Sequence, residues 1–255
     1  MLLEVRNVTK RFGGLTAVAD MSFGLAEGDI LGIFGPNGSG KTTLLNLISG
    51  IYLPTSGQLL WKGEDLTGRK PHEIAEAGIV KTFQNPQLFD ELSVFDNVAI
   101  AGHLWLKRSQ GVRRLRTLLP LRDRASEDLA RRIEHVLALC RLDALRDQPA
   151  SGLSYGGEKM LGVAMALMCE PQVLLLDEPG SGLGQDEIRN LDEVLRDLRG
   201  HGTTLCIIDH RVSFLGNLAD RAIVIHHGAK IAEGRPDEVL RDHAVIEAYL
   251  GQRHA

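Results

Sequence analysis

One glycine-rich segment constrains this chain more than any other part of its sequence. Gly35-Pro36-Asn37-Gly38-Ser39-Gly40-Lys41-Thr42 follows an apolar run, Ile30–Phe34, and opens a helical pattern over Lys41–Ser49. Glycines let backbone N–H groups turn inward around phosphate oxygens, and the positive end of the following helix dipole adds to that attraction. The order of strand, glycine-rich loop and helix therefore predicts a phosphate-binding loop in an α/β fold.

Two side chains and the loop backbone have separate expected roles. In this type of loop the lysine, here Lys41, reaches the β- and γ-phosphates, and the hydroxyl of Thr42 ligates Mg²⁺. The alternative is a strand-to-helix turn with a chance lysine, and the strand and helix that flank the loop argue against it. The residues expected to bind nucleotide here are Gly35, Pro36, Asn37, Gly38, Ser39, Gly40, Lys41, Thr42 and Thr43.

A phosphate loop alone does not distinguish an ATPase from a GTPase or a small-molecule kinase, but an acidic motif narrows the choice. An apolar strand pattern over Val173–Asp177 ends in the pair Asp177-Glu178. Asp177 is expected to hold Mg²⁺ through water, and Glu178 to polarise an attacking water. Paired acids at a strand end also cap helices, and the phosphate loop upstream favours the catalytic interpretation. No asparagine is followed by lysine, so the N-K-x-D signal of guanine recognition is absent.

The order of the expected elements predicts the fold class. Apolar runs such as Leu174–Leu176 and Ala222–Ile225 lack alternation, as expected of strands covered on both faces. Strands alternate with helices along the chain, which predicts a mainly parallel sheet with flanking helices. The expected strands are Leu2–Val8, Ile30–Phe34, Gln58–Lys62, Ile79–Phe83, Val173–Asp177, Thr203–Asp209 and Arg221–His226, and the expected helices are Lys41–Ser49, Glu158–Cys169, Glu187–Arg199 and Val212–Leu218.

Composition limits the class of protein. The 255 residues include 29 Lys and Arg against 33 Asp and Glu, a net charge of −4, so no overall basicity indicates a nucleic-acid partner. No apolar stretch approaches the roughly 20 residues that span a bilayer, and the N-terminus meets charge too early for a signal peptide. Three widely spaced cysteines without a metal-ligand pattern favour a reducing, cytoplasmic location.

One segment departs from this balance of charge. From Leu104 to Arg132 the sequence is helical in pattern and rich in arginine, with nine basic and three acidic side chains. A nucleic-acid or acidic-lipid surface is one interpretation, and a solvated helical face is the favoured one. No aromatic residue interleaves the basic ones between Lys107 and Arg132, so a stacking platform for single-stranded nucleic acid is absent.

A second helix start carries anion-binding chemistry. Leu153-Ser154-Tyr155-Gly156-Gly157-Glu158 precedes a helical pattern upstream of Asp177. A serine and glycines at a helix start leave N–H groups that point outward toward an anion. Two phosphate-binding helix ends in one chain suggest that the second serves the nucleotide of another chain. Taken alone, an ordinary N-cap and turn is the favoured interpretation of this segment.

Together these segments resemble the ATP-binding cassette (ABC) family, in the same order and over nearly the whole chain. The resemblance implies ATP and Mg²⁺ as cofactors. It implies that Gln84 ligates Mg²⁺ and senses the γ-phosphate, that His210 contacts the γ-phosphate, and that Phe12 stacks on adenine. The nucleotide-binding residues that it assigns to the signature segment are Ser154, Gly156 and Gly157.

The same resemblance implies one nucleotide-binding domain over residues 1–255. This domain would combine the phosphate-loop core with antiparallel β elements near the N-terminus, a helical lobe at about 85–165 and a C-terminal tail at about 236–255. Its catalytic residues would be Glu178, His210 and Gln84, and its metal ligands Thr42, Gln84 and Asp177.

Several stretches resemble the ATPase subunits of branched-chain amino-acid importers, namely Arg11–Val18, Lys81–Gln84, Leu88–Val94 and Ala248–Gly251. The basic segment and Tyr155 favour the longer of the two ATPase paralogues of such a system. Urea or amide importers and the lipopolysaccharide-export ATPase share much of this pattern. The implied partners are transmembrane permease subunits, a second ATPase chain and, indirectly, a substrate-binding protein, with the chain on the inner face of the cell membrane.

Two positions depart from the family pattern. Gly157 stands where glutamine is usual, and Gly184 stands where many members have aspartate, which is compatible with unequal sites in a heterodimer. Two other classes stay open. A soluble, non-transport ABC ATPase would more often carry two cassettes or a long coiled-coil insertion. A metabolic kinase would leave Ser154–Gly157 and His210 without a role.

Overall fold

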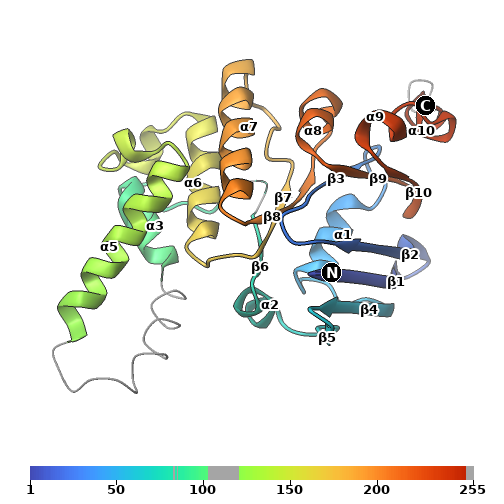
Figure 1. The fold of residues 1–255 in the computed structure, drawn as a ribbon, viewed down its shortest axis with the longest axis horizontal. Helices are drawn as coiled ribbons and strands as arrows, with labels where there is room; N and C mark the ends of the chain where they lie inside the picture. Colours follow the sequence, from blue (N-terminus) through green and yellow to red (C-terminus); the bar gives the residue numbers. More distant parts are fainter. Residues whose placement is uncertain (83, 85, 103–120, 251–255) are drawn as a thin grey trace. The chain divides into compact units, whose positions relative to one another are not determined.

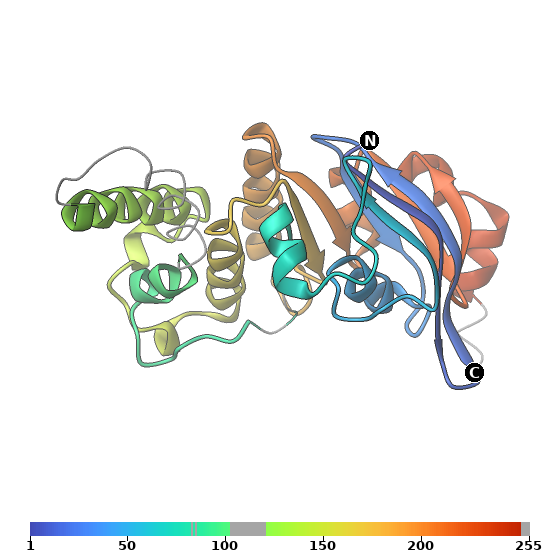
Figure 2. The same ribbon diagram turned by 90° about the horizontal axis from the view of Figure 1, so that it is seen from below.

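The computed structural model describes residues 1–82, 84, 86–102 and 121–250 (Figures 1 and 2). The chain divides into two compact units. The first consists of Met1–Lys81, Gln172–Ser181 and Arg199–Ala255, and the second of Thr82–Pro171 and Gly182–Leu198. None of the helices in the described ranges has both the length and the apolar composition needed to cross a bilayer.

The first unit contains a four-stranded antiparallel sheet near the N-terminus. Its order is β2-β1-β4-β5, formed by β1 (Leu3–Phe12), β2 (Leu15–Leu25), β4 (Ser56–Trp61) and β5 (Glu64–Asp65). The antiparallel β elements expected near the N-terminus are therefore confirmed, but β1 is longer than the predicted Leu2–Val8. It extends because the Gly13-Gly14 turn lets Phe12 pair with Leu15, with Gly13 at φ 57°.

The second sheet of this unit is mainly parallel, as predicted. Its order is β10-β9-β3-β8-β7-β6, formed by β10 (Ala229–Gly234), β9 (Arg221–His226), β3 (Ile30–Phe34), β8 (Thr204–Ile208), β7 (Val173–Asp177) and β6 (Ile79–Lys81). Only β10 runs antiparallel to its neighbour. Every residue of β3, β7 and β8 is buried, which explains why these strands are apolar without alternation.

Helix α1 (Lys41–Ile48) follows β3 directly and anchors the phosphate loop. Its residues Leu44 and Leu45 are fully buried in a core that also contains Val5 of β1 and Leu175 of β7. On the other face of β3, a Cβ added to Gly32 would lie 3.1 Å from the side chain of Leu215 in α8 (Val212–Leu218), so α8 covers that face closely. The remaining helices of this unit are α2 (Pro71–Ala77), α9 (Pro236–Val239) and α10 (His243–Leu250).

Four helices lie mainly or wholly in the described part of the second unit, and the bounds of about 85–165 expected for a helical lobe stay a prediction. Helix α3 (Val94–Ala101) packs against α5 (Leu121–Leu139) and α6 (Tyr155–Leu167), and α7 (Gln185–Gly200) stands beside α6 in Figure 1. The 3₁₀ turns Asp143–Leu145 and Ala150–Gly152 link α5 to α6. Of the basic segment predicted as helical over 104–132, residues 104–120 lie outside the described ranges, and so does Phe83 of the predicted strand Ile79–Phe83.

Two helices of this unit begin earlier than predicted because their first turns are capped. Helix α6 starts at Tyr155 rather than Glu158, since the Ser154 hydroxyl accepts a hydrogen bond from the Gly157 N–H at 3.1 Å. Helix α7 starts at Gln185 rather than Glu187, since Glu187 Oε2 accepts from the Gly184 N–H at 2.9 Å.

Candidate functional site

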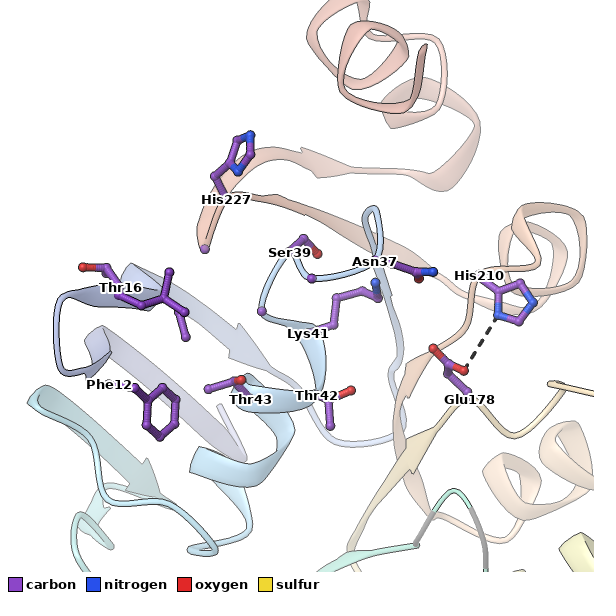
Figure 3. Close-up of a pocket in the computed structure, with 15 residues that line it drawn as sticks. Phe12, Thr16, Asn37, Ser39, Lys41, Thr42, Thr43, Glu178, His210 and His227 are labelled. Atoms are coloured by element: carbon purple, nitrogen blue, oxygen red, sulfur yellow. Dashed lines mark ion pairs between the residues drawn. The ribbon is translucent and has the colours of Figure 1, made fainter. Parts of the chain in front are cut away.

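A cavity of about 900 Å³ opens above the phosphate loop of the first unit (Figure 3). Its walls come from the tip of the β1–β2 hairpin, the loop and the start of α1, the segment after β7, the segment after β8, and the β9–β10 turn. The lining residues are Phe12, Leu15, Thr16, Ala17, Asn37, Gly38, Ser39, Gly40, Lys41, Thr42, Thr43, Glu178, His210, His227 and Gly228. A cavity of this size and polarity fits a small-molecule ligand.

The phosphate loop needs glycine where its backbone passes close to other strands. Gly40 has φ 104°, and a Cβ there would lie 2.2 Å from the carbonyl oxygen of Ala17. The β9–β10 turn supports the loop from another side, because the Gly228 N–H donates to the Ser39 carbonyl oxygen at 2.9 Å. The N–H groups of Lys41, Thr42 and Thr43 open α1, where no preceding helical turn supplies acceptors.

The Lys41 ammonium group is buried beneath this loop. Its Nζ donates to the carbonyl oxygens of Gly35 at 2.7 Å and of Pro36 at 2.9 Å, and 6% of the residue is exposed. Burial lowers the pKa of Lys41 below its usual value, while the carboxylates of Glu178 and Asp177 act in the opposite direction. An anion in the cavity would favour the charged ammonium group in the same way as these carboxylates.

Asp177 ends β7 with its carboxylate almost completely buried. Oδ1 accepts a hydrogen bond from the Thr42 hydroxyl at 3.2 Å, and Oδ2 lies 3.1 Å from Nζ of Lys81. Lys81 also donates to Oδ1 of Asn46 at 2.6 Å. The sequence patterns assign Lys81 and Asn46 no role, because the contacts of Lys81 with Asp177 and with Asn46 depend on how β6, β7 and α1 pack rather than on spacing along the chain.

Glu178 and His210 lie next to one another on one side of the cavity (Figure 3). His210 Nδ1 lies 3.9 Å from Glu178 Oε2. Glu178 has φ 52°, an unusual conformation for a residue other than glycine, and its N–H donates to the Ile208 carbonyl oxygen at 2.8 Å. A left-handed residue in a cavity with a buried lysine is typical of a functional site.

Asp209 fixes the segments that carry this pair. It is 1% exposed, and its carboxylate accepts from the N–H of Gly180 and from the N–H of Arg211, both at 2.9 Å. Sequence reasoning gives Asp209 no role, although an acid at the end of the apolar strand pattern Thr203–Asp209 is the same signal that marks Asp177. No comparable signal marks His227 or Gly228.

Phe12 lies at the rim of the cavity with 43% of its surface exposed. Its ring packs against that of Tyr52 in a T-shaped arrangement, with the ring centroids 5.3 Å apart and an interplanar angle of 78°. Lys10 Nζ lies 4.9 Å from the centre of the Phe12 ring. Contacts of both kinds stabilise aromatic rings, so an exposed side chain is held at the cavity rim.

The other predicted residues belong to the second unit. Gln84 is exposed. Ser154 caps α6, and a Cβ added to Gly156 would lie 2.4 Å from Oε1 of Glu187, so a larger residue there would displace the Glu187 side chain. Ser154, Gly156 and Gly157 line a hollow of about 170 Å³ within this unit.

Comparisons with known proteins agree with this geometry. The model of the ABC transporter family matches residues 18–181. The chain belongs to the ABC transporter family. A second model, described as branched-chain amino acid ATP-binding cassette transporter, matches residues 229–255.

Relatives in the ABC transporter family match this chain along nearly its whole length. The high-affinity branched-chain amino acid transport ATP-binding protein LivG of Salmonella typhimurium is 37% identical over 252 residues, which are 98% of each chain. The corresponding protein BraF of Pseudomonas aeruginosa is 35% identical, again over 98% of each chain. A nucleotide-free ATP-binding cassette from an ABC transporter superposes with a TM-score of 0.84 at 31% identity, over 97% of this chain and 98% of that one. A cassette solved in its ADP conformation gives the same TM-score and identity, over 98% of both chains.

The close approach at Gly40 generates a stability prediction with an internal control. Gly38 has φ 75°, so Gly38→Ala is expected to lower the free energy of unfolding by about 1–2 kcal/mol, the cost of a left-handed alanine. No steric cost is added, because no atom lies within 4 Å of a Cβ at this position. Gly40→Ala has the same cost and must also displace the Ala17 carbonyl, so we expect about 3 kcal/mol or more. Urea denaturation of both variants measures the difference. Equal losses would contradict the close packing at Gly40.

Proposed function

We propose that the chain is the ATP-hydrolysing, energy-coupling subunit of an ABC importer for branched-chain or related amino acids. One observation carries the proposal. The phosphate loop, the Glu178–His210 pair and Phe12 line one cavity, in a chain whose full-length relatives are named as branched-chain amino acid transport ATP-binding proteins. The C-terminal match to the branched-chain family model supports the substrate class.

The phosphates of ATP would bind in the loop between Gly35 and Thr43. The N–H groups at the start of α1 and the helix dipole favour negative charge there. Lys41 is pre-positioned for the β- and γ-phosphates, because the carbonyls of Gly35 and Pro36 hold its ammonium group beneath the loop. Adenine would stack on Phe12, whose ring is exposed at the cavity rim and is supported by Tyr52.

The donor set beside the loop suits Mg²⁺. Thr42 Oγ1 and Asp177 Oδ1 lie 3.2 Å apart, and both are oxygen donors of the kind that Mg²⁺ prefers. Within the described ranges, no cluster of three or more His, Cys, Asp or Glu residues could hold a metal ion, which fits an ion that keeps waters and phosphate oxygens as ligands. We propose Thr42 and Asp177 as the ligands from the first unit, and the role expected for Gln84 stays a prediction. The ion would neutralise charge on the transferred phosphoryl group.

Glu178 would orient and polarise the attacking water. Its side chain is 22% exposed and lines the cavity, and its Oε2 lies 3.9 Å from His210 Nδ1. His210 would contact the γ-phosphate and keep the attacking water, the Glu178 carboxylate and the phosphate aligned for reaction. Asp209 positions both residues, because it fixes the backbone of Gly180 and Arg211 through two hydrogen bonds.

A second cassette chain would complete each nucleotide site. Ser154 and Gly156 at the start of α6, with Gly157 beside them, would bind the γ-phosphate held by the partner's loop. Because ATP contacts both chains only when they meet, its binding favours the closed dimer, and hydrolysis removes those contacts. The partner is a second copy or a paralogue.

The segment before α3 would transmit closure to transmembrane permease subunits. Asn97 is fully buried and organises this segment, because its amide binds the N–H of Phe89 at 2.8 Å and the carbonyl oxygen of Ser93 at 2.9 Å. Phe89 itself is 50% exposed and available to a partner. The chain would then work in the cytoplasm on the inner face of the membrane, supplied indirectly by a substrate-binding protein.

Loss of the general base should separate ATP binding from hydrolysis. Glu178→Gln is expected to retain ATP binding and to lower the rate of hydrolysis by about 10²–10⁴-fold, the range for removal of a general base. Phosphate release and equilibrium dialysis with ATP measure the two steps. Glu64→Gln removes an exposed carboxylate outside the cavity and serves as the control. Near-normal turnover of Glu178→Gln would contradict the role of Glu178.

The transport role is tested by the proteins that accompany the chain. Tagged full-length chain, purified from detergent-solubilised membranes of its own host, is expected to bring two polytopic membrane proteins with it. Mass spectrometry of the purified complex identifies them. Recovery from the soluble fraction without any membrane protein would contradict a transport role and would favour a soluble ABC ATPase.

A further inference from the structure

Lys81 is a buried cation to which the proposed nucleotide site gives no role. It is the last residue of β6, and its side chain is 7% exposed. Its Nζ lies 3.1 Å from Oδ2 of Asp177 and donates to Oδ1 of Asn46 at 2.6 Å. Lys81 therefore joins three elements next to the cavity residue Thr42, namely β6, the end of β7 and helix α1.

Both oxygens of the Asp177 carboxylate are engaged. Oδ1 accepts from the Thr42 hydroxyl, and Oδ2 faces the Lys81 ammonium group. Thr42 and Asn46 are four residues apart on α1, so they lie on the same face of that helix, toward Asp177 and Lys81. A carboxylate that is 5% exposed requires such compensation, because an unpaired buried charge is strongly destabilising.

The ion pair between Lys81 and Asp177 opposes the binding of a second cation at Asp177. A metal ion that uses this carboxylate, directly or through water, comes within a few ångströms of the Lys81 ammonium group, and like charges at that distance repel strongly in a poorly hydrated site. Nucleotide phosphates supply negative charge that offsets this repulsion. The ion pair thus penalises a metal ion that arrives without a nucleotide.

We propose that Lys81 is a positioning residue of the magnesium site, which holds the Asp177 carboxylate in the metal-free protein and lowers the affinity of the site for a divalent cation without nucleotide. Mg²⁺ then enters together with the phosphates rather than ahead of them. The inference rests on the proposed roles of the phosphate loop and of Asp177.

The test uses Mn²⁺ as the probe with nucleotide-free, full-length protein. In Lys81→Met the competing cation is absent, so we expect the Mn²⁺ dissociation constant from electron paramagnetic resonance to fall by about tenfold or more. Mn²⁺ should also raise the urea midpoint of Lys81→Met by more than that of the wild type, because the metal replaces the missing cation. Lys81→Arg keeps the charge and should bind Mn²⁺ as the wild type does.

Lys230→Met is the matched control. Lys230 forms an ion pair with Glu233 at 2.5 Å and donates to the Ser22 carbonyl oxygen at 2.6 Å, in strands outside the cavity. Lys230→Met therefore also removes one ion pair and one hydrogen bond. Lys230→Met should lower the urea midpoint by the same amount in the presence and absence of Mn²⁺. If Lys81→Met does not fold, Lys81→Gln, whose amide keeps a donor for Asn46, is expected to shift Mn²⁺ binding in the same direction.

The inference would be overturned if Lys81→Met bound Mn²⁺ no more tightly than the wild type and lost the same stability with and without the metal. Lys81 would then be a structural residue only. Wild-type binding of Mn²⁺ with ATP separates this outcome from a failure of the proposed function. If the wild type binds neither ATP nor Mn²⁺ with ATP, the proposed nucleotide site itself is wrong.

Discussion

A carboxylate buried at the end of an apolar strand must be compensated, and the elements beside the cavity supply that compensation. Asp177 ends β7, whose residues are all buried, and its charge meets the Lys81 ammonium group and the Thr42 hydroxyl. These partners come from the adjacent strand β6 and from α1, the helix that carries the phosphate loop. Strand β6, helix α1 and the candidate metal site thus meet at one buried negative charge, which would be strongly destabilising without these partners.

Elsewhere around the cavity, buried charged groups are compensated by hydrogen bonds to the backbone. Asp209, at the end of β8, is buried and accepts two N–H groups, which fixes the residues that flank Glu178 and His210. The phosphate loop is held by glycine at the close approach of Gly40 to Ala17 and by the carbonyls that receive Lys41. Rigid polar contacts at the carboxyl ends of parallel strands therefore present groups with anion- and metal-binding chemistry.

Several of the elements predicted from the sequence have a continuous apolar run or a glycine-rich loop, and several elements without such a pattern were missed. Continuous apolar runs predicted β3, β7 and β9, and the glycine-rich loop predicted α1. Strand β10 was missed because its residues are mostly half-buried. Helices α2 and α3 were missed because they bury only one and two apolar residues, whereas the equally short α8 buries three. The contact of Lys81 with Asp177 could not be predicted, since it requires β6 to pair with β7 across more than ninety residues of sequence. The roles of the site residues, and the extent of a single domain over 1–255, stay predictions.

The central claim is that the amides at the start of α1 bind the phosphates of ATP. Hydrogen–deuterium exchange of the full-length wild-type chain, with and without saturating ATP and Mg²⁺, tests it directly, because the N–H groups of Lys41, Thr42 and Thr43 open the helix without preceding helical acceptors. The account predicts slower exchange across 38–43 when nucleotide is present, with no change in β4. Unchanged exchange in the loop under saturating ATP would contradict it.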